Sequence, residues 1–89
     1  MNQKVSETAP PSLSVSQIRA ARGLLGWSQS KLADAAGLSL PTIKRTELET
    51  VNVSPEAREK LRAALESAGV EFIPENGGGP GVRLRKARP

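Results

Sequence analysis

One segment in the middle of the chain constrains the fold more than any other, because it carries two helix starts in close succession. Ser28 and Ser39 can each cap a helix, since a serine hydroxyl accepts a hydrogen bond from an otherwise unpaired amide two or three residues later. Gly37, between them, can adopt the positive φ that ends a helix and reverses the chain. The segment therefore predicts two short helices joined by a tight turn, over about 29–36 and 40–48.

Both predicted helix starts also carry a hydrophobic staple, an apolar pair that brackets the capping serine. Trp27 is spaced for contact with Leu32, and Leu38 has the same spacing from Ile43. The outer face of the second helix is polar. A compact helix-turn-helix of this kind has a shape that fits the major groove of DNA.

The segment resembles the helix-turn-helix of the lambda-repressor/Cro-like family, the XRE-type regulators of bacteria and phages. The resemblance covers roughly residues 14–68. The tail 68–86 is also similar to the ending of many small, single-domain members. The resemblance implies an all-α fold, a small four-helix domain with a short C-terminal β-hairpin or extended tail. The matching residues are Arg22, Ser28, Gln29, Leu32, Ala33, Gly37, Ser39, Ile43 and Glu47.

The first and fourth helices have start signals of their own. Ser14 or Ser16 can cap a first helix that ends at Gly26, and Ser14 with Gln17 has the spacing of a capping box. The fourth helix opens at 54–56 with a serine cap, a proline at the first helical position and an acid in the first turn. Its apolar stripe is Ala57, Leu61, Ala64, Leu65 and Ala68, and Gly69 ends it.

Three regions follow from these signals. Residues 1–12 are polar and aperiodic, which predicts a disordered arm. The helix-turn-helix domain is expected over 13–69, and a β-hairpin with a basic tail over 70–89. Within the last region, the strand-like runs 70–73 and 82–85 flank a loop rich in glycine and proline.

The hairpin needs a surface to pack on, because an isolated two-stranded sheet is marginal in water. The helices contribute few large side chains, and Trp27 and Phe72 are the aromatic residues of the chain. The hairpin would be stabilised and the core enlarged if its apolar side chains packed against the helices or against a second subunit. These side chains are Phe72, Ile73, Val82 and Leu84. We infer a homodimer.

Charge is concentrated at the end of the chain. Residues 1–81 carry nine Lys or Arg and nine Asp or Glu, so the whole net charge of +4 comes from Arg83, Arg85, Lys86 and Arg88. Arg83, Arg85 and Lys86 are candidates for extra phosphate contacts, and the alternative is a solvated end that aids solubility. The glycine run before them lacks the spacing and the lysine of a phosphate-binding loop and is interpreted as a turn.

Composition excludes several classes of protein. The chain has no cysteine and no histidine, so it lacks a disulfide scaffold, the two commonest zinc ligands and the usual catalytic nucleophile and base. We expect no enzyme activity, no cofactor, no metal and no small-molecule substrate. No signal peptide or membrane span is evident, which predicts a cytoplasmic, nucleoid-associated protein.

The resemblance also implies roles for individual residues. In the family, the helix that starts near Leu40 lies in the major groove and the preceding helix crosses the phosphate backbone. Gln29 would then hold a phosphate, or is merely an exposed polar residue. Lys44 is assigned to phosphate, and Thr42 to either phosphate or base. The residues that would face base edges or the adjacent backbone are Ser39, Leu40, Thr42 and Arg45.

Arg45 is the best candidate for reading a base, because its guanidinium can bond O6 and N7 of guanine together. The alternative is a surface arginine paired with Glu49. Arg22 and Glu47 match residues that family members pair as a partly buried ion pair, a structural role. Two departures from the family pattern are Leu40-Pro41 at the tip of the recognition helix and the loop 48–52, which has no glycine and in which Asn52 could take the turn.

Three functions remain open at this point. The first is a sequence-specific DNA-binding transcriptional regulator, a homodimer on a near-palindromic operator. The second is an antitoxin or accessory module whose hairpin holds a protein partner, with DNA binding secondary. The third is a general nucleic-acid binder driven by the tail, which would show steep salt dependence without sequence preference.

Overall fold

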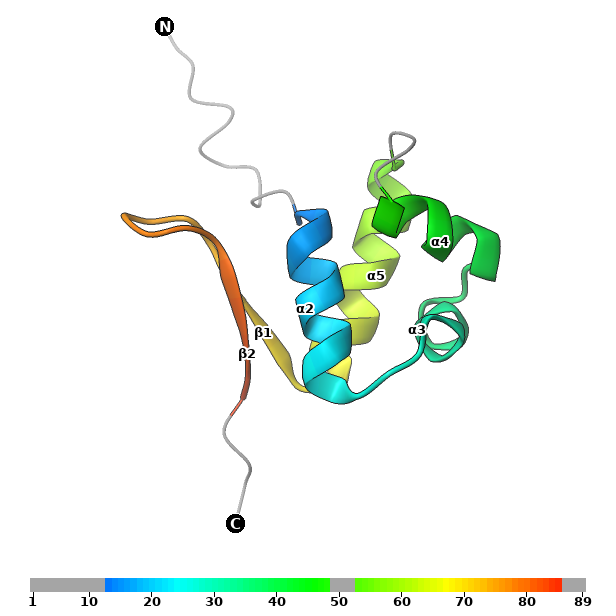
Figure 1. Cartoon of the computed structure of the whole chain (residues 1–89), viewed down its shortest axis with the longest axis horizontal. Helices are drawn as coiled ribbons and strands as arrows, with labels where there is room; N and C mark the ends of the chain where they lie inside the picture. The colour runs from blue at the N-terminus through cyan, green and yellow to red at the C-terminus, as the bar shows by residue number, and fades with distance from the viewer. Residues whose placement is uncertain (1–12, 49–52, 86–89) are drawn as a thin grey trace, which may run out of the picture.

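The computed structural model describes residues 13–48 and 53–85. It contains four helices and one antiparallel hairpin, which confirms the expected fold class (Figure 1). The predictions for the arm 1–12, for Glu49, for the turn at Asn52 and for Lys86 lie outside these residues. The elements are α2 (Val15–Leu25), α3 (Gln29–Ala36), α4 (Leu40–Leu48), α5 (Pro55–Ser67), β1 (Val70–Ile73) and β2 (Gly81–Leu84).

Local hydrogen bonds explain where the helices begin. Ser14 caps α2 in a full capping box with Gln17, so the helix starts two residues earlier than a cap at Ser16 would allow. Ser28 caps α3 by accepting from the N–H of Lys31. Ser54 caps α5 in the same way, with Pro55 in its first turn.

Two glycines end the first two helices in the left-handed conformation. Gly26 has φ 68° after α2 and Gly37 has φ 69° after α3. The fourth helix differs slightly from its prediction. Helix α5 ends at Ser67, and Gly69, with φ 109°, makes the turn into β1.

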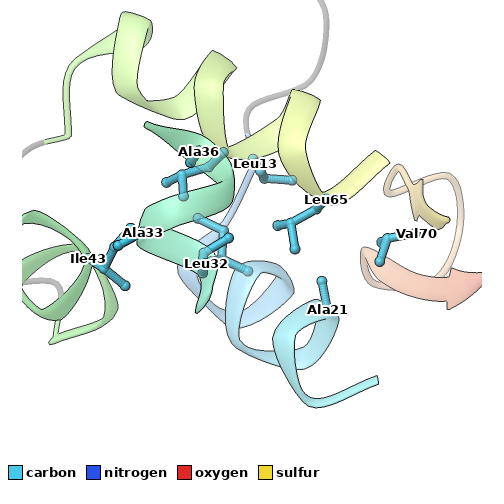
Figure 2. Close-up of a cluster of buried hydrophobic side chains, with 10 residues drawn as sticks. Leu13, Ala21, Leu32, Ala33, Ala36, Ile43, Leu65 and Val70 are labelled. Carbon is cyan, nitrogen blue, oxygen red and sulfur yellow. The ribbon is translucent and has the colours of Figure 1, made fainter. Parts of the chain in front are cut away.

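The core lies between the four helices and the first strand. Figure 2 shows its side chains converging from α2, α3, α4, α5 and β1, and all of them are aliphatic. Trp27, Leu38, Phe72 and Val82 pack against this core from its margin. The buried apolar residues of the cluster are Leu13, Ile18, Ala21, Leu32, Ala33, Ala36, Ile43, Leu61, Leu65 and Val70.

The hairpin packs on the helices through one face of its two strands. Val70 pairs with Leu84 and Phe72 with Val82, so these four apolar side chains share the face that meets α2 and α5. The second strand begins at Gly81, one residue before the predicted start, because Gly81 pairs with Ile73 at the end of the ladder.

Gln17 ties the hairpin to the first helix. Its Oε1 completes the capping box, and its Nε2 donates to the C=O of Gly81 at 2.9 Å and to that of Ile73 at 3.4 Å. The side chain is buried and both of its polar ends have partners, as buried amides require. None of the helices within 13–48 and 53–85 is long and apolar enough to cross a membrane.

Candidate nucleic-acid interface

Helix α4 has one face in the core and one face in solvent. Ile43, Thr46 and Glu47 are buried, because they lie at helical spacing on the side that meets α2 and α3. Lys44 and Arg45 point away from that side and are exposed. The predicted base-facing side of the helix is therefore open to solvent, with Leu40 and Thr42 half-buried at its beginning.

The start of α4 is organised by two hydroxyl groups. Ser39 Oγ accepts from the N–H of Thr42 at 3.2 Å, and the two hydroxyl oxygens lie 2.8 Å apart. One hydroxyl must donate to the other, so one hydroxyl hydrogen of the pair stays available to an outside acceptor in either arrangement. The pair can thus cap the helix and still donate to a phosphate or a base.

Pro41 is compatible with this helix start. It occupies the second position of α4, where a helix amide has no intrahelical acceptor, so the missing N–H breaks no bond of the helix ladder. Its side chain is exposed next to half-buried Leu40. The departure from the family pattern therefore changes the chemistry at the tip of α4 and leaves its helical geometry intact.

The residues expected to pair, Arg22 and Glu47, are in direct contact. Arg22 Nε donates to Glu47 Oε2 at 2.9 Å and Nη2 donates to Oε1 at 2.8 Å, a fork that joins α2 to α4. The Glu47 side chain is 4% exposed and that of Arg22 is 23% exposed. Arg22 also donates to the C=O of Trp27 at 3.0 Å, which fixes the turn after α2.

The surroundings of Glu47 favour its ionised form. Burial raises the pKa of this carboxyl, but hydrogen bonds from Arg22 and Gln29, with the charges of Arg22 and Arg19, outweigh burial and hold the pKa below its ordinary value. The hydrogen bond to Glu47 likewise raises the pKa of Arg22. The pair is therefore fully charged near neutral pH.

Gln29 lies at the first position of α3, where it was expected to hold a phosphate. Its Nε2 donates to Glu47 Oε1 at 3.0 Å, so the side chain joins the ion pair as a third member. A primary amide carries two hydrogens, and the second is left for another acceptor. The contact with Glu47 gives Gln29 a defined orientation that sequence reasoning missed.

Arg19 is a second residue that sequence reasoning missed. Its Nη1 donates to the backbone C=O of Glu47 at 2.6 Å, near the end of α4, where carbonyl groups lack intrahelical partners. Arg19 lies one helical turn before Arg22, and this spacing is the signal that could have identified it. Three side chains from α2 and α3 therefore hold one residue of α4.

The arginines of the hairpin are not brought to this face. Arg83 pairs with Glu71 across the strands at 3.1 Å, which lowers the pKa of Glu71, and Arg85 donates to the C=O of Glu66 at 2.8 Å. In Figure 1 the hairpin and α4 lie on opposite sides of α2 and α5. Within the described part of the chain, no cluster of acidic side chains is placed to hold a metal ion.

Comparison with known families places residues of this chain in a described family. The family described as helix-turn-helix matches residues 18–71, which is more than half of the chain. The matched range runs from within α2 through α5 and into β1, so it contains α3, α4 and the ion pair between α2 and α4. A search of curated proteins found no significant match.

Proposed function

The chain belongs to the lambda-repressor-like helix-turn-helix family of DNA-binding domains, and on this premise we propose that it is a sequence-specific transcriptional regulator. In this proposal, a homodimer places α4 of each subunit in the major groove of a near-palindromic operator. Half-sites would lie about one helical turn apart, or a multiple of it. The protein would act in the cytoplasm, at the nucleoid.

The observation that carries the proposal is the division of α4 into two faces. Its inner face is held by the core and by the contacts to Glu47, and its outer face carries Lys44 and Arg45 into solvent. A helix that is to enter a groove needs a fixed inner face, because a mobile helix would lose the geometry of its base contacts. It also needs an exposed outer face, because its side chains must reach the base edges.

The side chains of the outer face have the chemistry that such a contact requires. Arg45 can donate two hydrogen bonds to a guanine, and Leu40 can contact the methyl group of a thymine. Lys44 and the remaining amide hydrogen of Gln29 suit phosphate oxygens, which orient the protein without reading sequence. The hydroxyl pair Ser39–Thr42 can donate to either.

Selection of bound sequences from a random duplex pool tests this assignment. Wild-type protein should enrich one half-site motif, and Arg45→Ala should lose preference at one or two positions of that motif. Each such position should contribute about 1–3 kcal/mol. Lys60→Ala, on the exposed face of α5, is the matched control and should return the wild-type motif.

Two outcomes would contradict the proposal. If wild type enriches no motif, sequence-specific binding is wrong. If Arg45→Ala and Lys60→Ala both return the full motif, α4 does not read bases through Arg45.

Lys44→Ala should weaken binding to all sequences alike and reduce the salt dependence by about one phosphate contact.

A further inference from the structure

We propose that the outer edge of β2 is the surface through which two copies of this chain pair, in an antiparallel arrangement centred on Arg83. The inference deepens the proposed function, on which it rests for the existence of a dimer. It names the interface of that dimer and the contacts that form it.

The backbone of β2 has a free edge. The N–H of Arg85 donates to the C=O of Gly69 at 2.8 Å, which extends the ladder that pairs Arg83 with Glu71. Hydrogen-bonded pairs alternate along an antiparallel ladder, so the backbone groups of Val82 and Leu84 point away from β1. Within residues 13–48 and 53–85 the sheet has two strands, and these groups lie on its open side.

The other edge of the sheet is covered at its first residue, Val70. Strand β1 packs beside α5, and the C=O of Val70, which points away from β2, lies 3.5 Å from Arg85 Nη1. The contact of Gln17 with Ile73 and Gly81 places α2 over the face of the hairpin. The edge of β2 is therefore the side at which a further strand can be added.

The apolar face of the hairpin includes an exposed side chain at the edge of β2. Leu84 shares a face with fully buried Val70, yet it is 45% exposed. Leu24, in the last turn of α2, is also 45% exposed. A strand added beside β2 would extend the covered face of the sheet over Leu84, because side chains on neighbouring strands share one face.

A second copy of β2 fits this edge by symmetry. An antiparallel edge is complementary to itself about a two-fold axis, and with the axis at Arg83, Val82 of each copy pairs with Leu84 of the other. These pairs would form about four backbone hydrogen bonds. The apolar residues of both copies would then meet on the face that covers the helices.

Charge on the opposite face permits the same arrangement. The two Arg83 side chains would lie next to each other, but each already has the carboxylate of its own Glu71 at 3.1 Å. The row across four strands is acid, base, base, acid, which is neutral in total. Helices α3 and α4 lie beyond α2 and α5 from this edge, so the dimer leaves the outer face of α4 uncovered (Figure 1).

Cysteine cross-linking tests the register directly, since the chain has no cysteine of its own. In the proposed pairing, Arg83 faces its copy at a non-hydrogen-bonded position, where Cα atoms lie about 4.5 Å apart and a disulfide can form. Arg83→Cys should become mainly a disulfide-linked dimer on mild oxidation without DNA. Glu71→Cys removes the same ion pair but lies about 14 Å from its copy, three strand spacings away, and should stay monomeric under denaturing, non-reducing conditions.

A second variant tests the hydrogen bonds of the edge. Val82→Pro removes an amide that points away from β1, so the hairpin ladder is kept while the contact between copies loses bonds on both sides. Sedimentation should show wild type and Val82→Thr as dimers and Val82→Pro as a monomer. Circular dichroism should give all three the same helix content.

The proposal is overturned if wild type sediments as a monomer, if Val82→Pro remains a folded dimer, or if the two cysteine variants cross-link equally. If Val82→Pro fails to fold, the comparison of Arg83→Cys with Glu71→Cys decides alone. A monomer that still selects a DNA motif would refute this interface and leave the regulator intact. A cross-linked dimer that selects no motif would refute the regulator and leave the interface intact.

Discussion

Replacing Glu47 by alanine should destabilise the domain, and DNA affinity should fall only as a consequence. The substitution removes the acceptor for Arg22 Nε and Nη2 and for Gln29 Nε2, and it leaves a cavity where a side chain was 4% exposed. Breaking a fully buried ion pair costs about 3–5 kcal/mol. Because the Arg22 side chain is 23% exposed and can regain water, we expect about 2–3 kcal/mol.

Thermal unfolding followed by circular dichroism measures this loss. In a domain of this size, 1 kcal/mol shifts the melting temperature by about 4–8 °C, so the expected decrease is about 10–20 °C. Glu71→Ala is the matched control, since it removes an exposed carboxylate that is also paired with an arginine. It should leave the melting temperature nearly unchanged, because an exposed ion pair is screened by water.

DNA binding must be measured well below the melting temperature of each variant, so that both proteins are folded. Under those conditions Glu47→Ala should keep the operator motif of wild type, because Arg45 and Lys44 are unchanged. A Glu47→Ala variant that melts like wild type but no longer binds DNA would refute the reasoning. It would make the carboxylate a part of the binding surface and not a support of α4.

Three further predictions concern stability. Folding lowers the pKa of Glu47, so the stability that this carboxylate contributes is present above its unfolded pKa of about 4.3 and is lost as pH falls through the folded value. Acid titration of wild type should therefore show a loss of stability below about pH 4 that is missing in Glu47→Gln. Gln17→Ala should cost about 1–3 kcal/mol and increase amide exchange in the hairpin more than in α3, because it leaves the cap and the hairpin carbonyls without their partner. Gly37→Ala should lower the melting temperature, since Gly37 has φ 69°. Gly23→Ala should stabilise the domain by about 0.5–1 kcal/mol and raise the melting temperature, because Gly23 lies inside α2 and an added Cβ would meet open space. Equal shifts of one sign in the two variants would contradict this.

Much of the fold could be predicted because its signals act over a few residues. The caps at Ser28 and Ser54 bond amides three positions later, and Gly37 acts through its own φ angle. Such interactions are the same in any tertiary context, so sequence spacing is enough to identify them. The contact between Arg22 and Glu47 spans 25 residues, and it was expected because of the family resemblance, not because of local spacing.

The polar contacts between elements were not predictable in this way. Sequence spacing assigned Gln17 to a capping box, but only packing brings its other end to Gly81, 64 residues away. The sequence pattern gave Arg19 no role, and it assigned Gln29 to a phosphate or to the exposed surface. Each has its partner on α4 because the packing of α2 and α3 against α4 brings Glu47 within hydrogen-bond distance of both side chains.

The sequence by itself determined the number of helices and their approximate bounds, which side of each is apolar, and that the segment of Ser28 to Glu47 is a helix-turn-helix. The tertiary structure decided that the hairpin lies away from α4, with Arg83 paired to Glu71 and Arg85 bonded to the C=O of Glu66. It also decided that, among the residues the structure describes, β2 has a free edge. The physical reason is how far apart in the sequence the interacting groups lie. Capping and backbone preference depend on neighbours along the chain, whereas the place of a charged side chain relative to a helix depends on how buried surfaces far apart in the sequence fit together.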